Sequence, residues 1–286
     1  MLQFFKNPNY NIVGKRRIAF IVSIAIILAG LVSLLIQGLN YGVDFAGGAK
    51  MQIEFKENIS AEELRTLFTE KDLGNPEIKS SGENEYMITI SADDAENSDE
   101  LLKEALTGVE YSILQIDKVG PKIGAEMRNN SLKAVGIALL LILIYITVRF
   151  EFKFAIGAVV ALIHDVLITL AFFSFFQLEF SLPVLAAFLT IVGYSLNDTI
   201  VVYDRIRENI KIHKGKPLQE VINLSINQSL SRTIITSLTT FVVVLILAIF
   251  GGQVLFGFSI AIVIGVIVGT YSSMFVAAPI LIIWGH

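Results

Sequence analysis

The chain has 286 residues, of which 54% are hydrophobic and 17% are charged, and its net charge is −4. The mean hydropathy of +0.68 lies outside the range of soluble globular proteins and predicts a membrane protein. The absence of cysteine excludes a disulfide-stapled domain. Most of the acidic residues lie in residues 38–131, which predicts a solvated domain inserted between membrane segments.

The amino-terminal segment, residues 1–17, is polar and basic, and residues 18–37 after it form the first apolar run. This run is long enough for a transmembrane helix. A cleaved signal peptide is the alternative. Signal peptides usually have a shorter apolar core and a small-residue cleavage site, and the sequence shows no such site. Residues 18–37 are therefore predicted to be the first transmembrane helix.

A glycine-rich motif, GVDFAGG at 42–48, follows the first span. A flexible exit loop is one interpretation, because glycine mainly reports backbone freedom. The other is a hinge or entry motif, made by Gly42, Asp44, Phe45, Gly47 and Gly48.

Residues 38–131 are predicted to form a folded domain. Alternating and helical patterns predict strands and helices in the order 50–55, 60–71, 76–80, 86–91, 98–106 and 111–119. The first helix opens with a capping-box pattern from Ser60 to Glu63. The resulting order, βαββαβ, is that of the ferredoxin-like α+β fold.

Five more apolar runs are predicted to be transmembrane helices, which gives an α-helical multi-pass protein with six spans. They cover about 132–148, 154–177, 183–203, 234–250 and 254–283. Residues 204–231, between the fourth and fifth spans, are predicted to form an amphipathic hairpin broken at Lys214–Pro217. Four-residue spacing of small residues in the sixth span, from Gly257 to Gly269, predicts close helix packing.

Basic residues are distributed unevenly among the short loops. The loops at 149–153 and 204–231 carry Lys and Arg, whereas those at 178–182 and 251–253 carry none. The positive-inside bias therefore predicts that both termini and the hairpin are cytoplasmic and that residues 38–131 are extracytoplasmic.

The fourth span contains a carboxylate, which a helix that served only as a membrane anchor would not have. Asp198 lies fifteen residues after Pro183, or about 22 Å along a helix, which is still inside a hydrocarbon core about 30 Å thick. A charge there costs at least about 2.5 kcal/mol even on a lenient insertion scale. Asp198 is therefore predicted to be a functional residue, with Asn197 beside it.

The fifth span supplies the predicted counterpart. Arg232, Thr236 and Thr240 share one helical face by four-residue spacing. A low dielectric opposes the charge of a carboxylate and a guanidinium favours it, so Asp198 facing Arg232 could bind and release an ion such as a proton. A static ion pair is the alternative for the two charges, and bonding to their own helix backbone is the alternative for the threonines.

The third span carries His164 and Asp165 about ten residues in. Two interpretations stay open: a second functional polar site, or a hydrogen-bonded lock between helices. The sequence contains no phosphate-binding loop, nucleophile elbow or metal-ligand cluster. It therefore predicts no enzyme activity, cofactor or metal, and any energy would come from an ion gradient or a partner.

Four motifs in combination give a resemblance to the SecF family of bacterial protein-export membrane proteins. They are GVDFAGG at 42–48, ALIHDV at 161–166, GYSLNDTIVVYDRIREN at 193–209 and SRTIITSLTTF at 231–241. The resemblance covers almost the whole chain and extends to the resistance-nodulation-division (RND) transporter superfamily. In this family the aspartate of LNDT and the arginine of SRT are implicated in proton coupling, and these fall on Asp198 and Arg232.

The resemblance implies a partnership with SecD, which would supply a second set of six spans. It also implies action beside the SecYEG channel, with SecA and YajC in the wider complex, on unfolded preprotein. The proton or sodium gradient across the inner membrane would drive this action, and the sequence leaves the ion open. A small-molecule efflux component of the same superfamily and a passive scaffold for SecD are the alternatives.

Overall fold

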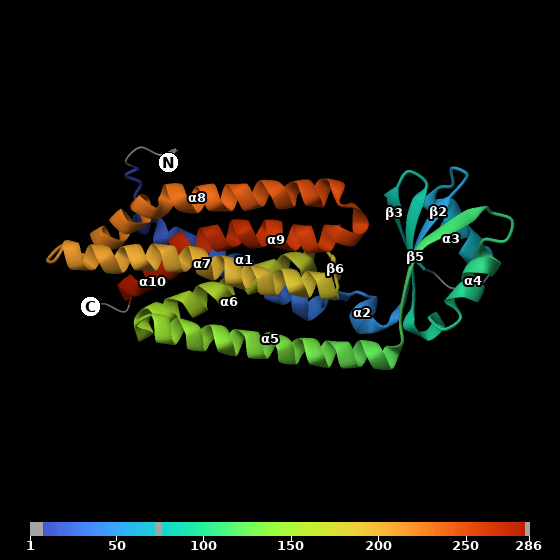
Figure 1. Ribbon diagram of the computed structural model, residues 1–286, viewed down its shortest axis with the longest axis horizontal. Helices are drawn as coiled ribbons and strands as arrows, with labels where there is room; N and C mark the ends of the chain where they lie inside the picture. Colours follow the sequence, from blue (N-terminus) through green and yellow to red (C-terminus); the bar gives the residue numbers. More distant parts are fainter. Residues whose placement is uncertain (1–7, 72–75, 284–286) are drawn as a thin grey trace.

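The computed structural model describes residues 8–71 and 76–283, so the predicted segment 1–17 is described only from Pro8 onward. Figure 1 shows a bundle of long helices with a small domain of strands and short helices at one end of it. The chain enters the small domain through α2 (Val43–Ala46) and leaves it directly into α5.

Within the described residues, six helices are long and apolar enough to cross a membrane, which confirms the predicted six-span architecture. They are α1 (Arg16–Ile36), α5 (Pro121–Arg149), α6 (Phe152–Phe175), α7 (Leu182–Ile212), α8 (Leu218–Phe250) and α9 (Gly252–Ser272), the last continuing to Ile283. Helix α7 packs along both α8 and α9. The small residues Gly257, Gly265 and Gly269 of α9 lie against α7 side chains, as their spacing predicts.

Two predicted helix starts differ from the structure. Helix α5 begins at Pro121 and not near residue 132, because proline is favoured at the first position of a helix and the single glycine that follows, Gly124, costs only about 1 kcal/mol in a helix. Helix α8 begins at Leu218, so the predicted interfacial helix and the fifth span are one helix. The segment Ser231–Thr233 between them contains neither glycine nor proline, the residues that least favour a helix.

The sixth span is not a uniform α-helix over 254–283, which is the third difference. Helix α9 passes into a π-helix, η3 (Ser273–Ala277), before α10 (Ala278–Ile283). Pro279 in α10 has no backbone N–H to donate to the preceding turn. The Tyr203 hydroxyl of α7 donates to the Ala277 carbonyl at 3.0 Å, so a carbonyl of the π-helix is paired from outside the helix.

The small domain has the predicted βαββαβ order. Its elements are β2 (Gly48–Phe55), α3 (Ala61–Glu70), β3 (Glu77–Gly82), β4 (Glu85–Ile90), α4 (Ser98–Ala105) and β5 (Tyr111–Val119). The strands form one antiparallel sheet in the order β3-β4-β2-β5, which is the ferredoxin-like arrangement. The buried core lies between one face of this sheet and the two helices, and includes Met51, Ile53, Leu64, Phe68, Ile88 and Leu102.

The predicted capping box at the start of α3 is present. The Ser60 hydroxyl accepts from the Glu63 backbone N–H, and the Ser60 backbone N–H donates to the Glu63 carboxylate at 2.7 Å. The backbone N–H of Ser60, and then its hydroxyl, hold the pKa of the Glu63 carboxyl below its ordinary value.

Candidate functional site

Asp198 is buried in the seam between α7, α8 and α9, with 2% of its surface exposed. One side-chain hydrogen bond reaches its carboxylate among the described residues, from the Ser237 hydroxyl of α8 at 3.4 Å. Ser237 also shares a 2.6 Å hydrogen bond with Thr270 of α9. A carboxylate can accept about four hydrogen bonds, so Asp198 retains free acceptor capacity.

Arg232 does not form an ion pair with Asp198 in this structure, because no nitrogen–oxygen contact within 4.0 Å joins these two described residues. Its side chain is exposed on the single chain. Arg232 lies five residues before Ser237, or about 8 Å nearer the α7–α8 turn by helical rise. The Arg232 charge nevertheless acts on the Asp198 carboxylate, from the exposed face of α8.

Of the other predicted coupling residues, Thr236 lies close enough to interact with the Asp198 carboxylate, whereas no hydrogen bond joins Asn197 or Thr240 to it among the described residues. Asn197 is exposed. The Thr236 hydroxyl donates to the carbonyls of Arg232 and Thr233 in its own helix, a hydrogen bond that threonine in a helix commonly makes. Thr240 is half-buried.

The residue that sequence reasoning missed is Ser237. Four-residue spacing selects the face of α8 that carries Arg232, but the buried face carries Thr233 and Ser237, which are 1% and 7% exposed. Thr233 and Ser237 are also four residues apart, so the same spacing pattern, shifted by one residue, would have selected the buried face. The Thr233 hydroxyl is buried and has no partner among the described residues.

The second acid, Asp165, has a complete set of partners. Its Oδ1 lies 2.8 Å from Nδ1 of His164. Its Oδ2 accepts from the hydroxyls of Ser195 in α7 and Ser272 in α9. Asp165 and His164 are 1% and 5% exposed, so this cluster is enclosed by protein.

His164 extends this network to α1. Its Nε2 lies 2.9 Å from the Ser23 hydroxyl, which in turn lies 3.1 Å from the Tyr271 hydroxyl. The Tyr271 ring stacks on the His164 ring with centroids 5.8 Å apart. Four helices, α1, α6, α7 and α9, therefore meet in one continuous polar cluster.

The two acid clusters are neighbours along α7. Ser195, which donates to Asp165, precedes Asp198 by three residues, or one helical turn. Thr199, which follows Asp198 in α7, shares a 3.0 Å hydrogen bond with Ser273 of the π-helix. Hydroxyl groups thus line the inner face of α7 and α9, and π-helices are frequent at functional sites.

The glycine-rich motif forms a tight junction at the domain end of the bundle. Asp44 accepts a 2.8 Å hydrogen bond from the Leu182 backbone N–H at the start of α7, where a helix favours negative charge. Gly47 and Gly48 have positive φ angles of 81° and 137°. A Cβ atom on Gly47 would approach the Pro121 backbone to 3.1 Å, and one on Gly48 would lie 2.7 Å from the Ile90 carbonyl.

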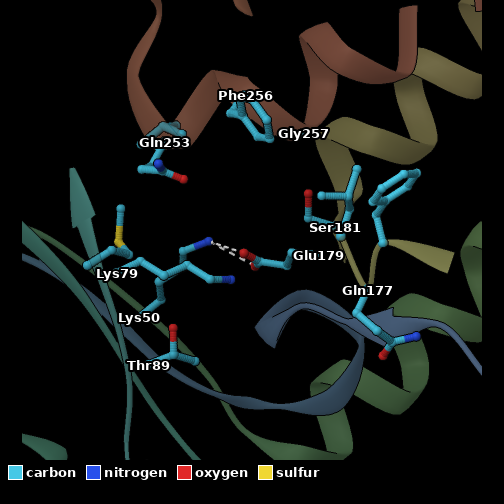
Figure 2. Close-up of a pocket in the computed structure, with 13 residues that line it drawn as sticks. Lys50, Lys79, Thr89, Gln177, Glu179, Ser181, Gln253, Phe256 and Gly257 are labelled. Carbon is cyan, nitrogen blue, oxygen red and sulfur yellow. Dashed lines mark hydrogen bonds and ion pairs between the residues drawn. The ribbon is translucent and has the colours of Figure 1, made fainter. Parts of the chain in front are cut away.

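The small domain meets the bundle through an ion pair. Figure 2 shows Lys50 of β2 and Glu179 of β6 (Glu179–Phe180) pointing toward one another across a cavity of about 230 Å³. The Lys50 ammonium lies 2.8 and 2.7 Å from the two carboxylate oxygens, and the two side chains are 20% and 27% exposed. Beside this ion pair, β1 (Asn40–Tyr41) and β6 form a short parallel ladder.

Comparisons with known proteins agree with this architecture. A family model described as "Protein export membrane protein SecD/SecF, C-terminal" matches residues 99–286, and a "SecD/SecF GG Motif" model matches residues 32–59. The protein translocase subunit SecF of Rhodothermus marinus is 45% identical, with 98% of this chain and 95% of the relative covered. That of Vibrio alginolyticus is 41% identical, with 92% and 86% covered.

Two solved SecDF structures share the fold. The chain is 38% identical to the translocon-associated membrane protein SecDF of Thermus thermophilus, with a TM-score of 0.88. A second structure, SecDF in a super-membrane-facing form, is 37% identical with a TM-score of 0.75. The matches cover 97% and 99% of this chain but only 39% and 40% of the solved chains, so the chain spans about two fifths of the SecDF proteins that it matches.

The family model covers more than half of the chain, and relatives above 40% identity cover almost all of it. The six apolar helices agree with the names of these relatives in pointing to a multi-pass inner-membrane protein. The chain belongs to the SecD/SecF family of protein-export membrane proteins.

Proposed function

We propose that this chain is the SecF subunit of a SecDF complex and uses an ion gradient to promote export of unfolded preprotein across the cytoplasmic membrane. The observation that carries the proposal is Asp198, a buried carboxylate with free acceptor capacity in a seam lined by hydroxyl groups. Ionisable groups inside membrane spans are rare and usually functional. No other observation on the chain points as directly to ion coupling.

A partner is part of this proposal. The chain spans about two fifths of the solved SecDF proteins, and transporter halves commonly pair as structural repeats. Asn197 and Arg232 are exposed on this chain, next to the seam that holds Asp198. We infer that a SecD subunit covers this face, so that the coupling site lies between the two subunits.

The coupling step is an exchange of a proton, or sodium ion, at Asp198 that changes how α7 packs against α8. Movement of α7 would reach the small domain at two contacts. Asp44 bonds the start of α7, and Glu179, just before α7, pairs with Lys50 of the sheet. Because an isolated and partly exposed ion pair contributes little stability, the domain can leave this contact at small cost and pull on an emerging preprotein.

The orientation in the membrane follows from the basic loops. Arg149 and Lys153 flank the turn between α5 and α6, and five basic residues lie between Arg205 and Lys216. The positive-inside bias supports cytoplasmic termini and an extracytoplasmic small domain, residues 38–131. The domain would then face preprotein as it leaves SecYEG, with SecA on the opposite side of the membrane and YajC in the wider complex.

His164 and Asp165 have a different role in this proposal. Every oxygen of the Asp165 carboxylate has a partner, and these partners come from three helices. Such enclosure supports the lock between helices. The cluster would keep α1, α6, α7 and α9 together as one unit, which moves against α8 when Asp198 exchanges its ion.

The test compares two aspartates of the same helix. Asp198→Asn is expected to abolish gradient-stimulated preprotein export in inverted membrane vesicles, while co-purification with SecD is unchanged. Asp204→Asn is the matched control, since Asp204 is exposed and paired with Arg149 and Arg207 at the end of the span. Collapsing the proton gradient and the sodium gradient separately identifies the ion.

The two alternatives give other results. A passive scaffold predicts normal export for Asp198→Asn, because assembly with SecD is all that it requires. A small-molecule efflux component predicts gradient-driven movement of a small substrate and no effect on preprotein. The interior of the small domain argues against efflux, because its core is filled by packed apolar side chains and a ligand site needs a cavity.

A further inference from the structure

An apolar groove of about 510 Å³ lies between α5 and the pair α6 and α7, in the half of the bundle nearest the small domain. Leu132, Val135 and Leu139 form its wall on α5, and Leu185 and Leu189 form its wall on α7. Helix α5 is the least enclosed of the six spans, with 6% of its most apolar window buried against 50% for α6 and α7. The groove therefore opens to the membrane.

The mouth of the groove is polar and carries a positive charge. Arg128, Asn129 and Ser131 line it, at the end of α5 that emerges from the small domain. Arg128 is exposed and makes no ion pair with any described residue. From Arg128 to Leu139 the helix rises about 16 Å, which is about half of the hydrocarbon thickness. The cationic mouth suits the anionic headgroup of a phospholipid, and the apolar groove, one leaflet deep, suits its acyl chain.

We propose that this groove binds one anionic phospholipid from the leaflet on the side of the small domain. Arg128, with Asn129 and Ser131, binds the phosphate, because a guanidinium presents paired donors to phosphate oxygens. An acyl chain lies along Leu132, Val135 and Leu139.

The same lipid would touch the junction with the small domain. Tyr41, Phe45 and Phe180 line the groove near its mouth, and Phe45 and Phe180 pack with ring centroids 6.0 Å apart. Helix α5 is also continuous with the sheet through Gly120. A lipid that fills the groove therefore holds α5 against α6 and α7 at the point where the domain is attached.

Photo-crosslinking tests the proposal on the full chain, purified with its co-purifying partner and placed in nanodiscs. The probes are phosphatidylglycerol and phosphatidylcholine with the same mid-chain diazirine, and the labelled peptides are identified by mass spectrometry. Phosphatidylglycerol is expected to label the peptides around Val135 and Leu189 about fivefold more than phosphatidylcholine, the preference expected from one basic residue. Arg128→Gln should remove this preference, whereas Lys133→Gln, which changes a basic residue outside the groove lining, should retain it.

A pair of bulky substitutions tests the groove itself. Val135→Trp, inside the groove, should reduce labelling of the α7 peptide several-fold, and Ile137→Trp, on the exposed side of α5, should not. Equal labelling by both lipids, or loss of the preference in both charge variants, would overturn the proposal. So would crosslinking of a photoreactive residue at position 135 to the partner chain, because a protein segment would then occupy the groove.

Discussion

The bundle contains two buried acids, Asp165 of α6 and Asp198 of α7, and they differ in how completely they are paired. Asp165 accepts from His164, Ser195 and Ser272, whereas Asp198 accepts one 3.4 Å hydrogen bond from Ser237. Both are at most 2% exposed, so burial does not distinguish them. A buried carboxylate inside a membrane protein therefore has to be judged by its hydrogen-bond partners. Asp165 has several partners and is a structural contact, whereas Asp198 has free acceptor capacity for a further partner or an ion.

The largest expected difference between the two acids is in stability. Asp165→Ala leaves His164, Ser195 and Ser272 without their shared acceptor, and is expected to lower the free energy of unfolding by about 3 kcal/mol. Asp198→Ala removes one long hydrogen bond and should cost about 1 kcal/mol or less. Equilibrium unfolding in mixed micelles measures both. Equal losses would contradict the distinction between the two sites.

Arg232 tests whether the Asp198 site is completed by charge. Arg232→Gln is expected to reduce preprotein export about tenfold, equivalent to about 1.4 kcal/mol, with no effect on unfolding because the side chain is exposed and unpaired with other described residues. Arg232→Lys keeps the charge and should retain most of the export. Full export by the glutamine variant would show that the guanidinium is not part of the coupling.

The sequence predicts the architecture of this protein better than it predicts which side chains each helix turns toward its neighbours. The six spans and the βαββαβ domain follow from runs and periods of apolar residues, and the structure confirms both. The register of α8 does not follow, because threonine and serine occupy several sides of it between Ser231 and Thr240. Four-residue spacing from Arg232 selects Thr236, whereas the direct hydrogen bond to Asp198 comes from Ser237, one residue or about 100° further around the helix.

The network around His164 could not be predicted for a similar reason. Ser23, Tyr271 and Ser272 lie in the first and last spans, and only tertiary packing brings them to the third. The π-helix that presents Ser273 to Thr199 depends on the contact of Tyr203 with the Ala277 carbonyl. The sequence shows Pro279 but not the hydroxyl that satisfies the backbone before it.

Ser23 tests whether Asp165 belongs to a hydrogen-bonded lock between four helices. Ser23→Ala removes the hydroxyl between His164 and Tyr271 and is expected to lower the free energy of unfolding by about 1 kcal/mol. It should also shift the ring ¹⁵N resonances of His164. Ser33→Ala is the matched control in the same helix, since Ser33 bonds Ser174 and lies outside the cluster. A His164 spectrum that both variants leave unchanged would show that α1 takes no part in the lock.

The most direct comparison, and the smallest single effect, comes from the two serines that donate to the two acids. Ser195→Ala removes a hydroxyl from Asp165 of α6, and Ser237→Ala removes one from Asp198 of α7; the two serines are 1% and 7% exposed. Ser195 makes a short hydrogen bond to Asp165, and hydrogen bonds to charged groups contribute about 1.5 to 3 kcal/mol. Ser237 makes a long one, so its loss should change the free energy of unfolding by about 0.5 kcal/mol. If Ser237→Ala is the more destabilising of the two, the Asp198 site is already complete within this chain, and the inference that a second subunit completes it is wrong.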